Sequence, residues 1–304
     1  MSGPVVVAVI SSFRPSEAVL VRYGALVGQV SAVVVADDGS GPAAEGVLGS
    51  LEALGADVVR RDTNDGIAVT LNAGIARARS HHGAEWILTL DQDTSLAPHY
   101  VEQLLATARA ALGAGLPVGS VSYAEQNGRP VARLGTEHGY DLAYDPMQSG
   151  LLLPVSTLDT VGGLREDLFI DWVDTEFNER VRAAGLLTIV APGTDLDHSL
   201  GSMRPLTILG RPVTRHGKQL SVAYHPPFRT YYMSRNAVLV TRRSFSRHPR
   251  WTASRLAHDL IGHAARVVVG PQRRGHLLAI AAGALHGLRG RSGKIPAPLL
   301  QHLS

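Results

Sequence analysis

The chain has 304 residues, of which 45% are apolar and 18% are charged, and it contains no cysteine. This composition excludes a mostly disordered chain, a disulfide framework, a thiolate metal site and a cysteine nucleophile. The longest late apolar stretch, between Arg274 and Arg289, has 14 residues, whereas a membrane-spanning helix needs ~20. The first residues lack the basic segment and cleavage site of a secretory signal. We therefore expect a cytoplasmic protein without a membrane-spanning segment.

The net charge of +3 is very unevenly distributed. Residues 1–200 hold 12 Lys and Arg against 25 Asp and Glu, which gives −13. Residues 201–304 hold 17 basic residues against a single acid, Asp259, which gives +16. An acidic part suits metal and general-base chemistry, and a basic part suits phosphates, anionic lipid or nucleic acid. The alternative is that the two charges only neutralise each other within one molecule.

The hydrophobic pattern predicts strands that alternate with helices. The expected strands cover 5–10, 32–36, 57–60, 85–90, 117–122 and 187–191. The expected helices cover about 16–27, 43–54, 67–80, 98–112 and 172–185, and residues 125–150 look irregular and are expected to cover a cleft. Such alternation implies an α/β fold with a parallel sheet covered on both faces. Ligands of such sheets bind beyond the carboxyl ends of the strands.

The C-terminal part alternates apolar helical segments with basic residues. From Arg242 to Lys294 the basic residues recur on both sides of segments such as 277–282. Basic clusters beside an amphipathic helix attract anionic lipid, so we expect this region to associate with a membrane surface. A helical interface of a homo-oligomer or an exposed basic face is the alternative. No recognised motif for nucleic acid accompanies the charge, so no nucleic-acid partner is expected.

The strongest local signal is the pair Asp91 and Asp93, which directly follows an expected buried strand. Such a turn presents oxygen ligands to Mg²⁺ or Mn²⁺, and water and substrate phosphates supply the remaining ligands. The cation would offset the charge that grows on a departing diphosphate. An ordinary loop or helix cap is the alternative. His198, after the last expected strand, becomes a metal-ligand candidate only in the company of this turn.

Two further polar turns follow expected strands. Asp37-Asp38-Gly39-Ser40 can accept hydrogen bonds from a nucleobase imide or from ribose hydroxyls, and a plain turn or helix cap is the alternative. Asn64-Asp65-Gly66 and the following Asn72-Ala73-Gly74 lead into a helix of small residues. Small residues would let this helix lie near a ligand, although ordinary tight packing explains them as well.

Two acids stand at the start of the helix expected from 172. Asp171 and Asp174 are three residues apart and would share one face at a helix N-terminus. One of these carboxylates could deprotonate an acceptor hydroxyl as a general base. The alternative is that early acids only complement the helix dipole.

In this order, the motifs resemble those of the inverting GT-A glycosyltransferases of family 2, and in detail those of bacterial rhamnosyltransferases. The resemblance covers about residues 5–240, and the motifs that carry it are Val7–Ser12, Asp37–Ser40, Asn64–Gly66, Asn72–Ile75, Asp91–Asp93, Gln148–Gly150 and Asp171–Asp174. The closer resemblance comes from Leu90–Asp93, Phe169–Asp174, Phe228–Tyr232 and Arg235-Asn236.

The resemblance implies a GT-A fold, which is Rossmann-like with a mostly parallel central sheet and helices on both faces. It implies a nucleotide-sugar transferase domain over 1–240 and a basic helical region over 241–304. It also implies a divalent metal, a nucleotide-sugar donor with dTDP-L-rhamnose favoured, and a glycan or lipid-diphosphate-linked acceptor in cell-envelope polysaccharide synthesis. The enzyme would be peripheral on the cytoplasmic face of the plasma membrane. A galactofuranosyl or other hexosyl transferase of the same fold stays open.

The resemblance also assigns roles to single residues. Asp174 would be the general base of a single inverting displacement, with Asp171 as its neighbour or as an acceptor contact. The metal ligands would be Asp93, His198 and Asp91. The donor contacts would be Ser11, Asp37, Asp38, Asn64, Asn72, Asp91, Arg229 and Arg235, and the acceptor contacts would be Ser149, Gly150, Trp172, Tyr231 and Tyr232. Many family members carry two adjacent acids before the helix, whereas these two are separated, so which of them is the base stays open.

Two other functions compete with this interpretation. A phosphatase or phosphotransferase could use Asp91 as nucleophile and Asp93 as acid and base, but it would leave the other polar turns without a task. A non-catalytic carbohydrate-binding or scaffold module on the same fold is the second competitor. A nicotinamide dehydrogenase is disfavoured because no Gly-x-Gly-x-x-Gly follows a strand.

Overall fold

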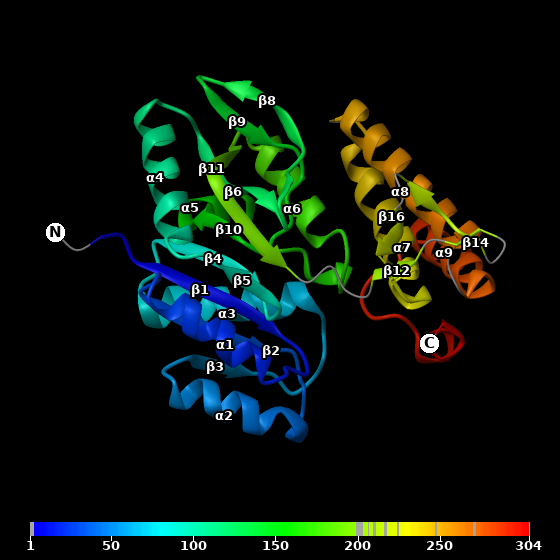
Figure 1. Cartoon of the computed structure of the whole chain (residues 1–304), viewed down its shortest axis with the longest axis horizontal. Helices are drawn as coiled ribbons and strands as arrows, with labels where there is room; N and C mark the ends of the chain where they lie inside the picture. Colours follow the sequence, from blue (N-terminus) through cyan, green and yellow to red (C-terminus); the bar gives the residue numbers. More distant parts are fainter. Residues whose placement is uncertain are drawn as a thin grey trace. The chain divides into compact units, whose positions relative to one another are not determined.

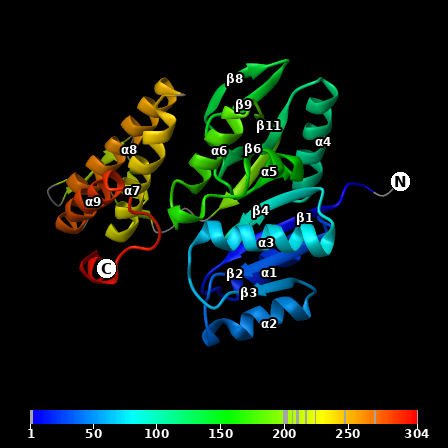
Figure 2. The same cartoon turned by 180° about the vertical axis from the view of Figure 1, so that it is seen from behind.

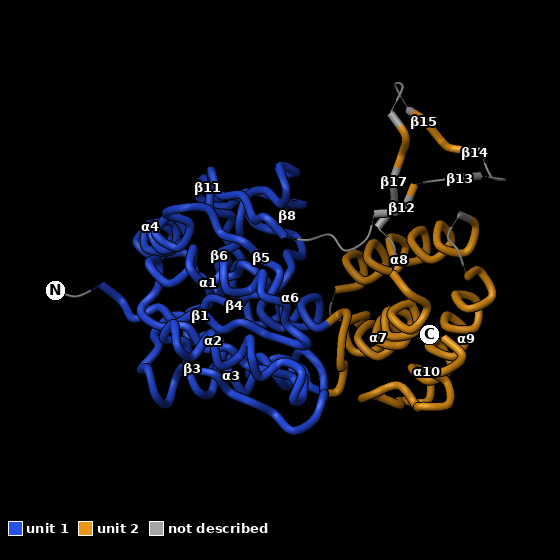
Figure 3. Tube along the Cα trace, turned by 60° about the horizontal axis from the view of Figure 1, so that its bottom comes forward, with its two compact units in different colours: residues 1–166, 173–199 blue, residues 167–172, 200–304 orange. Residues whose placement is uncertain are grey.

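The computed structural model describes residues 3–198, 203–205, 207–208, 211–215, 218–223, 225–246, 248–269 and 272–303. Contacts divide the chain into two compact units (Figure 3). Unit 1 comprises residues 1–166 and 173–199, and unit 2 comprises residues 167–172 and 200–304. The short segment 167–172 therefore groups with the C-terminal helices, although both of its neighbours in the chain belong to unit 1.

Unit 1 is built around a large mixed sheet with the strand order β3-β2-β1-β4-β10-β6-β11-β9-β8 (Figure 1). Its parallel part comprises β1 (Val6–Ser12), β2 (Ala32–Asp37), β3 (Asp57–Arg60) and β4 (Trp86–Asp91). β10 (Leu151–Pro154) runs antiparallel between β4 and β6 (Val118–Gln126), and β6 pairs in parallel with β11 (Leu187–His198). The remaining strands are β5 (Thr94–Leu96), β7 (Arg129–Pro130), β8 (Arg133–Glu137) and β9 (Tyr140–Ala143).

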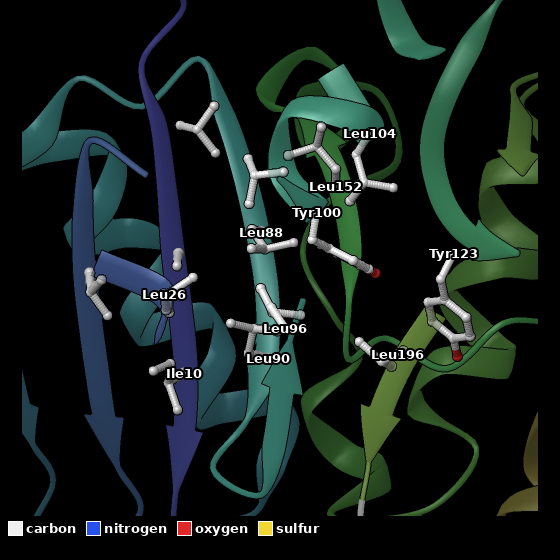
Figure 4. Packing of buried hydrophobic residues seen from close by; sticks show 14 of the residues in the cluster. Ile10, Leu26, Leu88, Leu90, Leu96, Tyr100, Leu104, Tyr123, Leu152 and Leu196 are labelled. Atoms are coloured by element: carbon white, nitrogen blue, oxygen red, sulfur yellow. The ribbon is translucent and has the colours of Figure 1, made fainter. Parts of the chain in front are cut away.

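Helices cover both faces of this sheet because the central strands are apolar on both sides; every residue of β1 is buried. α1 (Ala18–Val27), α2 (Glu45–Ala53) and α4 (Tyr100–Gly113) pack on the face to which Ile10 and Leu88 belong (Figure 4). α3 (Ile67–His82) packs on the other face (Figure 2). Gly74 brings α3 so close to β1 that a Cβ atom there would collide with Val9. α5 (Val155–Val161) packs on β10 and α6 (Val173–Ala183) on β11.

The six expected strands and five expected helices of this unit are confirmed, with ends that differ by a few residues. Residues 125–150 are more regular than expected, because β8 and β9 form an antiparallel hairpin there. The hairpin has no apolar face that the sequence could reveal, since all of β8 is exposed. β11 continues to His198, well beyond the expected end at 191, because its last residues pair with the unexpected strand β5.

Unit 2 contains the basic helices expected from the sequence. They are α7 (Pro227–Ser244), α8 (Pro249–Val269), α9 (Arg273–Leu288) and α10 (Ala297–Leu303). Short two-stranded ladders precede them, formed by β12 (Met203–Pro205) with β17 (Ser221–Ala223), β13 (Thr207–Ile208) with β14 (Arg211–Pro212), and β15 (Thr214–Arg215) with β16 (Lys218–Gln219). Among the described helices, none combines the length and apolarity that crossing a bilayer requires.

Close packing joins α7 to α9. A Cβ atom on Gly283 would lie 2.5 Å from the carbonyl oxygen of Tyr231, and one on Gly287 would lie 2.7 Å from that of Arg235. The contacts therefore group the whole of α7 with the C-terminal helices. The domain boundary that we expected from the sequence, at residue 240, falls inside this helix and stays a prediction about the transferase domain.

Candidate functional site

The carboxyl ends of the parallel strands bring the first polar turns to one edge of the sheet. Residue pairing places Ser11 opposite Asp91, and Ser12 opposite Asp37. Because β1, β2 and β4 run in the same direction, the turns that follow them lie at the same edge, where open α/β sheets bind ligands.

Three predicted metal ligands meet at this edge. Asp91, Asp93 and His198 each offer one ligand atom, and these atoms lie within 4.8 Å of one another. His198 reaches the cluster because β11 pairs with β5, which sets it opposite Thr94. Its Nδ1 atom lies 2.9 Å from the Thr94 hydroxyl oxygen and 3.5 Å from a carboxylate oxygen of Asp93. Asn127 fixes the backbone of His198 through two hydrogen bonds of 2.8 and 3.0 Å.

Within the part of the chain that the structure describes, no basic side chain pairs with the carboxylates of this cluster. Asp91 accepts hydrogen bonds from the Ser11 hydroxyl at 3.3 Å and from the Gln148 amide at 2.7 Å. Burial raises the pKa of Asp91, whereas His198 and the two hydrogen bonds oppose that rise. Among the described residues, no Lys or Arg forms an ion pair with Asp91 or Asp93. Two carboxylates and an imidazole without a basic partner fit Mn²⁺ or Mg²⁺, and the partly exposed Asp93 leaves the cluster open to a ligand.

The turn Gln148–Gly150 holds the cluster in position through hydrogen bonds. The backbone N–H of Asp91 donates to the Ser149 hydroxyl at 2.9 Å, and that hydroxyl lies 2.7 Å from the hydroxyl of Thr94. Gly150 has a φ of +86°, and a Cβ atom there would lie 2.7 Å from a methyl group of Leu196. Ser149 and Gly150 are both buried. Their burial speaks against the predicted acceptor contacts and shows instead how the loop holds Asp91.

The two acids after β2 shape the neighbouring loops. Asp37 accepts hydrogen bonds from the backbone N–H of Ser40 at 2.8 Å and from its hydroxyl at 2.5 Å. Asp38 accepts from the backbone N–H groups of Asp65 and Gly66 at 2.9 and 3.0 Å. The Asp37 carboxylate thereby closes its own turn, and the Asp38 carboxylate joins this turn to the loop that contains Asn64. Their contacts with a nucleoside, and that of Asn64 with the donor, stay predictions.

The other predicted donor residue of this unit, Asn72, is engaged inside the protein. Its amide nitrogen donates to the carbonyl oxygen of Leu164 at 2.8 Å and to Glu166 at 2.9 Å, and its oxygen accepts from the N–H of Leu164 at 2.9 Å. Three of the four hydrogen bonds that a carboxamide can make are thus used. Asn72 ties α3 to the segment after α5, and this structural task competes with the predicted donor contact.

The two base candidates differ in their partners. Asp174 lies in the first turn of α6, where its carboxylate accepts a hydrogen bond from the N–H of Thr175 at 2.8 Å. Asp171, in unit 2, accepts two hydrogen bonds from the guanidinium of Arg229, at 2.5 and 3.2 Å. Two hydrogen bonds from one guanidinium occupy both oxygens of the Asp171 carboxylate and hold it in a fixed orientation. Asp174 stays the first candidate for the base, as the resemblance implies, and Arg229 has a carboxylate partner where a donor contact was predicted.

Four of the predicted ligand contacts lie in the interior of unit 2, namely Arg235, Tyr231 and Tyr232 of α7, and Trp172 of the segment 167–172. Arg235 is 0% exposed, Tyr231 and Tyr232 are each 1% exposed, and Trp172 is 3% exposed. The Tyr231 hydroxyl lies 2.8 Å from a ring nitrogen of His286, and the Tyr232 hydroxyl accepts from the N–H of Ile295 at 2.8 Å. Because these four residues are buried and have protein partners, the structure gives them a role in the interior of unit 2, and their contacts with a substrate stay predictions.

Comparison with known proteins supports the family expected from the motifs. The sequence model of Glycosyl transferase family 2 matches residues 17–152. The chain is also 27% identical over 192 residues to dTDP-rhamnosyl transferase RfbF of Shigella flexneri, an alignment that covers 60% of this chain. It spans about three fifths (61%) of the length of that curated relative. The resemblance to family 2 and to bacterial rhamnosyltransferases is thus confirmed.

Solved structures support the fold. The chain resembles residues 1–349 of TarS from S. aureus in complex with UDP-GlcNAc, with a TM-score of 0.53 and 12% identity over 94% of this chain and 92% of that chain. It resembles GalNAc-T7 with UDP, GalNAc and Mn²⁺, with a TM-score of 0.56 and 10% identity over 94% and 56%. It resembles the mannosyltransferase PcManGT of Pyrobaculum calidifontis with GDP-Man and Mn²⁺, with a TM-score of 0.51 and 15% identity over 99% and 79%. The predicted GT-A fold is confirmed.

Proposed function

We propose that this chain, whose residues 17–152 belong to glycosyl transferase family 2, is a metal-dependent inverting glycosyltransferase. It would transfer a sugar from a nucleotide diphosphate to a hydroxyl group of a glycan or lipid-linked glycan. The observation that carries the proposal is the cluster of Asp91, Asp93 and His198 at the ligand-binding edge of the sheet. A phosphotransferase would also use the two acids but has no need of the imidazole.

One curated relative supports L-rhamnose as the donor sugar. The relative from S. flexneri is named a dTDP-rhamnosyl transferase. The structural neighbours hold UDP-GlcNAc, GDP-Man, or UDP with GalNAc, and at 10–15% identity they support the fold alone. We therefore propose dTDP-L-rhamnose first, with a galactofuranosyl or other hexosyl donor as the alternative.

The proposed mechanism assigns one task to each group of residues. Asp91, Asp93 and His198 would hold Mg²⁺ or Mn²⁺, which supplies positive charge beside the diphosphate when bound. Asp174 would accept the proton of the acceptor hydroxyl. The acceptor oxygen then bonds to the anomeric carbon as the bond to the diphosphate oxygen breaks, so the configuration inverts. Ser149 and Thr94 would keep the cluster in position through their hydrogen bonds.

The donor and the metal requirement can be tested together. Purified protein is incubated with dTDP-rhamnose, UDP-galactofuranose, UDP-glucose or GDP-mannose, each with Mg²⁺, with Mn²⁺ or with EDTA. We expect hydrolysis or transfer with one donor, and its loss in EDTA. Phosphate release from simple phosphoesters without any sugar nucleotide would support the phosphotransferase instead. No turnover and no binding of any donor would remove the enzyme proposal.

A membrane surface is the proposed place of action. Leu277, Leu278, Leu285 and Leu288 of α9 are 44–63% exposed and recur at helical spacing. Exposed arginines stand at both ends of this row, namely Arg273, Arg274, Arg289 and Arg291, and α9 contains no acid. An apolar helix face between cations fits the interface of an anionic bilayer. We therefore propose peripheral binding on the cytoplasmic face of the plasma membrane, where a lipid-diphosphate-linked acceptor would be available.

Flotation with vesicles tests this proposal. We expect the protein to float with phosphatidylcholine vesicles that contain phosphatidylglycerol, and to be released by high salt. The double variant Arg273→Glu/Arg274→Glu should lose binding. Arg109→Glu/Arg129→Glu, with the same change of charge on exposed residues of unit 1, is the matched control. Equal loss in both variants would assign the binding to net charge alone, and no flotation of the wild type would exclude the surface.

A further inference from the structure

The segment 167–172 has a backbone that its own sequence does not favour. Phe169, Asp171 and Trp172 all have positive φ angles, of 67°, 63° and 67°. For residues other than glycine this left-handed conformation costs ~1 kcal/mol or more each, and bulky aromatic residues adopt it rarely. Such a conformation persists only where surrounding groups enforce it.

Two buried residues of α7 supply that enforcement. Asn236 is 0% exposed, and its amide nitrogen lies 2.8–2.9 Å from the carbonyl oxygens of Leu168, Ile170 and Asp171. One side chain therefore gathers three carbonyl groups of a six-residue segment. Together with the bond from the N–H of Ile170 to the carbonyl oxygen of Leu168, these bonds hold the backbone of the segment in its shape.

Arg235 holds Asn236 and the segment together. Its Nε–H donates to the Asn236 side-chain oxygen at 2.9 Å, which orients the amide nitrogen toward the segment. One of its terminal nitrogens donates to Leu168 at 2.9 Å, and the other donates to the carbonyl oxygen of Gly293. The guanidinium also lies 4.9 Å from the ring centre of Tyr232. Burial lowers the pKa of Arg235, and the carbonyl oxygens and the ring compensate the buried charge.

The side chains of the segment are fixed as well. Phe169 stacks on Tyr232, with ring centres 5.0 Å apart. The indole N–H of Trp172 donates to Asp259 at 3.0 Å, and Arg255 lies over the indole ring. Asp259 is the single acid among residues 201–304. The one negative charge of the basic region is thus used to hold this segment.

We infer that Arg235 and Asn236 are positioning residues of the transfer reaction. This inference rests on the proposed function. The segment that they hold contains Asp171 and ends one residue before α6, whose second residue is the proposed base, Asp174. Fixing the backbone of 168–172 fixes the chain from which the first turn of α6 starts. Arg235 and Asn236 would therefore act on the reaction through the backbone that directly precedes Asp174 in the chain.

The first test separates chemistry from donor binding. In Asn236→Asp the three carbonyls would face a carboxylate instead of donors, and in Asn236→Ala they would lose their donor. We expect the kcat of transfer to fall at least tenfold, while the Kd of the nucleoside diphosphate with Mn²⁺ changes less than twofold. His286→Phe removes a hydrogen bond of Tyr231 elsewhere in unit 2 and is the matched control, with kcat retained. An unchanged kcat in folded Asn236 variants, or a parallel loss of donor binding, would overturn the inference.

The second test does not depend on activity. In a chain with Trp86→Phe and Trp251→Phe, Trp172 is the single tryptophan. We expect its emission to shift to the red and its quenching by acrylamide to rise in Asn236→Ala but not in His286→Phe. If Asn236→Ala does not fold, Asp259→Asn, which weakens the contacts of Asp259 with Trp172 and Arg255, takes its place. Unchanged emission and quenching would overturn the inference even if no donor were found, whereas an inactive wild type with the expected shifts would remove the proposed function alone.

Discussion

The acidic cluster of Asp91 and Asp93 in unit 1 and the acids Asp171 and Asp259 of unit 2 have opposite kinds of partner. At the edge of the sheet in unit 1, Asp91 and Asp93 have hydroxyl, amide and imidazole neighbours. In unit 2, Asp171 receives two hydrogen bonds from Arg229, and Asp259 lies 3.8 Å from Arg255 and accepts from an indole. The first cluster carries negative charge that the described protein does not neutralise, whereas the acids of the second are neutralised within the unit.

This difference separates a binding site from a scaffold. Bringing two carboxylates together beside a buried strand is costly unless a cation joins them. Such an arrangement indicates a ligand from outside the chain. An acid that already has its arginine contributes shape, because its charge is satisfied before any ligand arrives. The charges of −13 and +16 in the two parts of the sequence give no hint of this distinction.

The largest expected effect is that of Asp174→Asn. If Asp174 is the base, the amide cannot accept the proton, and transfer should fall by ~10³-fold, within the range of general-base catalysis. The affinity for Mn²⁺ and for the nucleoside diphosphate should stay as in the wild type, since the cluster of unit 1 is unchanged. Single-turnover kinetics and calorimetry measure the two quantities.

Asp171→Asn is the matched control for the base. Its carboxylate is engaged by Arg229, so we expect a smaller loss of transfer than for Asp174→Asn. The opposite order of the two variants would make Asp171 the base. That result would also show that an acid paired with an arginine can act as a base, which contradicts the distinction between the acids of the two units.

Removal of a metal ligand is the next largest effect. Asp93→Asn should weaken Mn²⁺ binding and reduce donor turnover by ~10²-fold, equivalent to about 3 kcal/mol of transition-state stabilisation. Asp197→Asn, an exposed acid beside His198 on β11, is the control and should retain both. Electron paramagnetic resonance of bound Mn²⁺ measures the affinity. Equal Mn²⁺ affinity in Asp93→Asn and the wild type would contradict the metal site.

The sequence predicts the parallel part of the sheet and the edge at which Asp91 and Asp93 lie, for a simple reason. Long apolar runs identify β1, β2 and β4, and parallel direction alone then sets their carboxyl ends side by side. The approach of His198 to Asp93 follows from a pairing that the sequence does not reveal, because β5 has only three residues and no pattern. The alternation of polar and apolar residues from Asp195 to His198 does indicate that β11 continues, and this signal was available.

The roles of α7 could not be predicted in the same way. Arg235 and the two tyrosines look like ligand contacts because polar residues in a motif are associated with function. Their burial depends on Gly283 and Gly287 of α9, which lie about 50 residues further along the chain. The positive φ angles of the segment 167–172 leave no trace either, since Phe and Trp are not the residues that favour them. The sequence did contain a pattern that indicates a buried helix face. Apolar residues recur at helical spacing around Arg235, namely Tyr232, Leu239 and Val240.

Loosening the contact between α7 and α9 should have an effect on stability. In Gly287→Ala the new methyl group would lie 2.7 Å from the carbonyl oxygen of Arg235 and from Cβ of Val238. Overpacking of this kind costs about 2 kcal/mol, so the midpoint of urea unfolding of unit 2 should fall. Gly24→Ala in α1, where nothing lies within 4 Å, should stabilise by about 0.5–1 kcal/mol. If Gly287→Ala also abolished Mn²⁺ binding, the assignment of metal binding to unit 1 and of a supporting role to unit 2 would be wrong.

The smallest expected effect is a dependence of stability on pH in unit 2. Burial, with the nearby Arg266 and His276, lowers the pKa of His263 to about 4. The unfolded chain takes up this proton near the ordinary pKa of about 6.5, so between these values the unfolded state binds more protons and stability falls as the pH falls. At pH 5.5 this amounts to about 1 kcal/mol relative to neutral pH.

The variant His263→Gln tests this dependence. It should unfold more easily at neutral pH, because it loses the contact with Ser234. In chemical denaturation, its free energy of unfolding should fall by about 1 kcal/mol less than that of the wild type between neutral pH and pH 5.5. His302→Gln, at an exposed position of α10, should keep the wild-type dependence. Equal slopes in all three proteins would mean that His263 is already open to water, and that unit 2 does not hold its polar groups in the closed interior from which its supporting role follows.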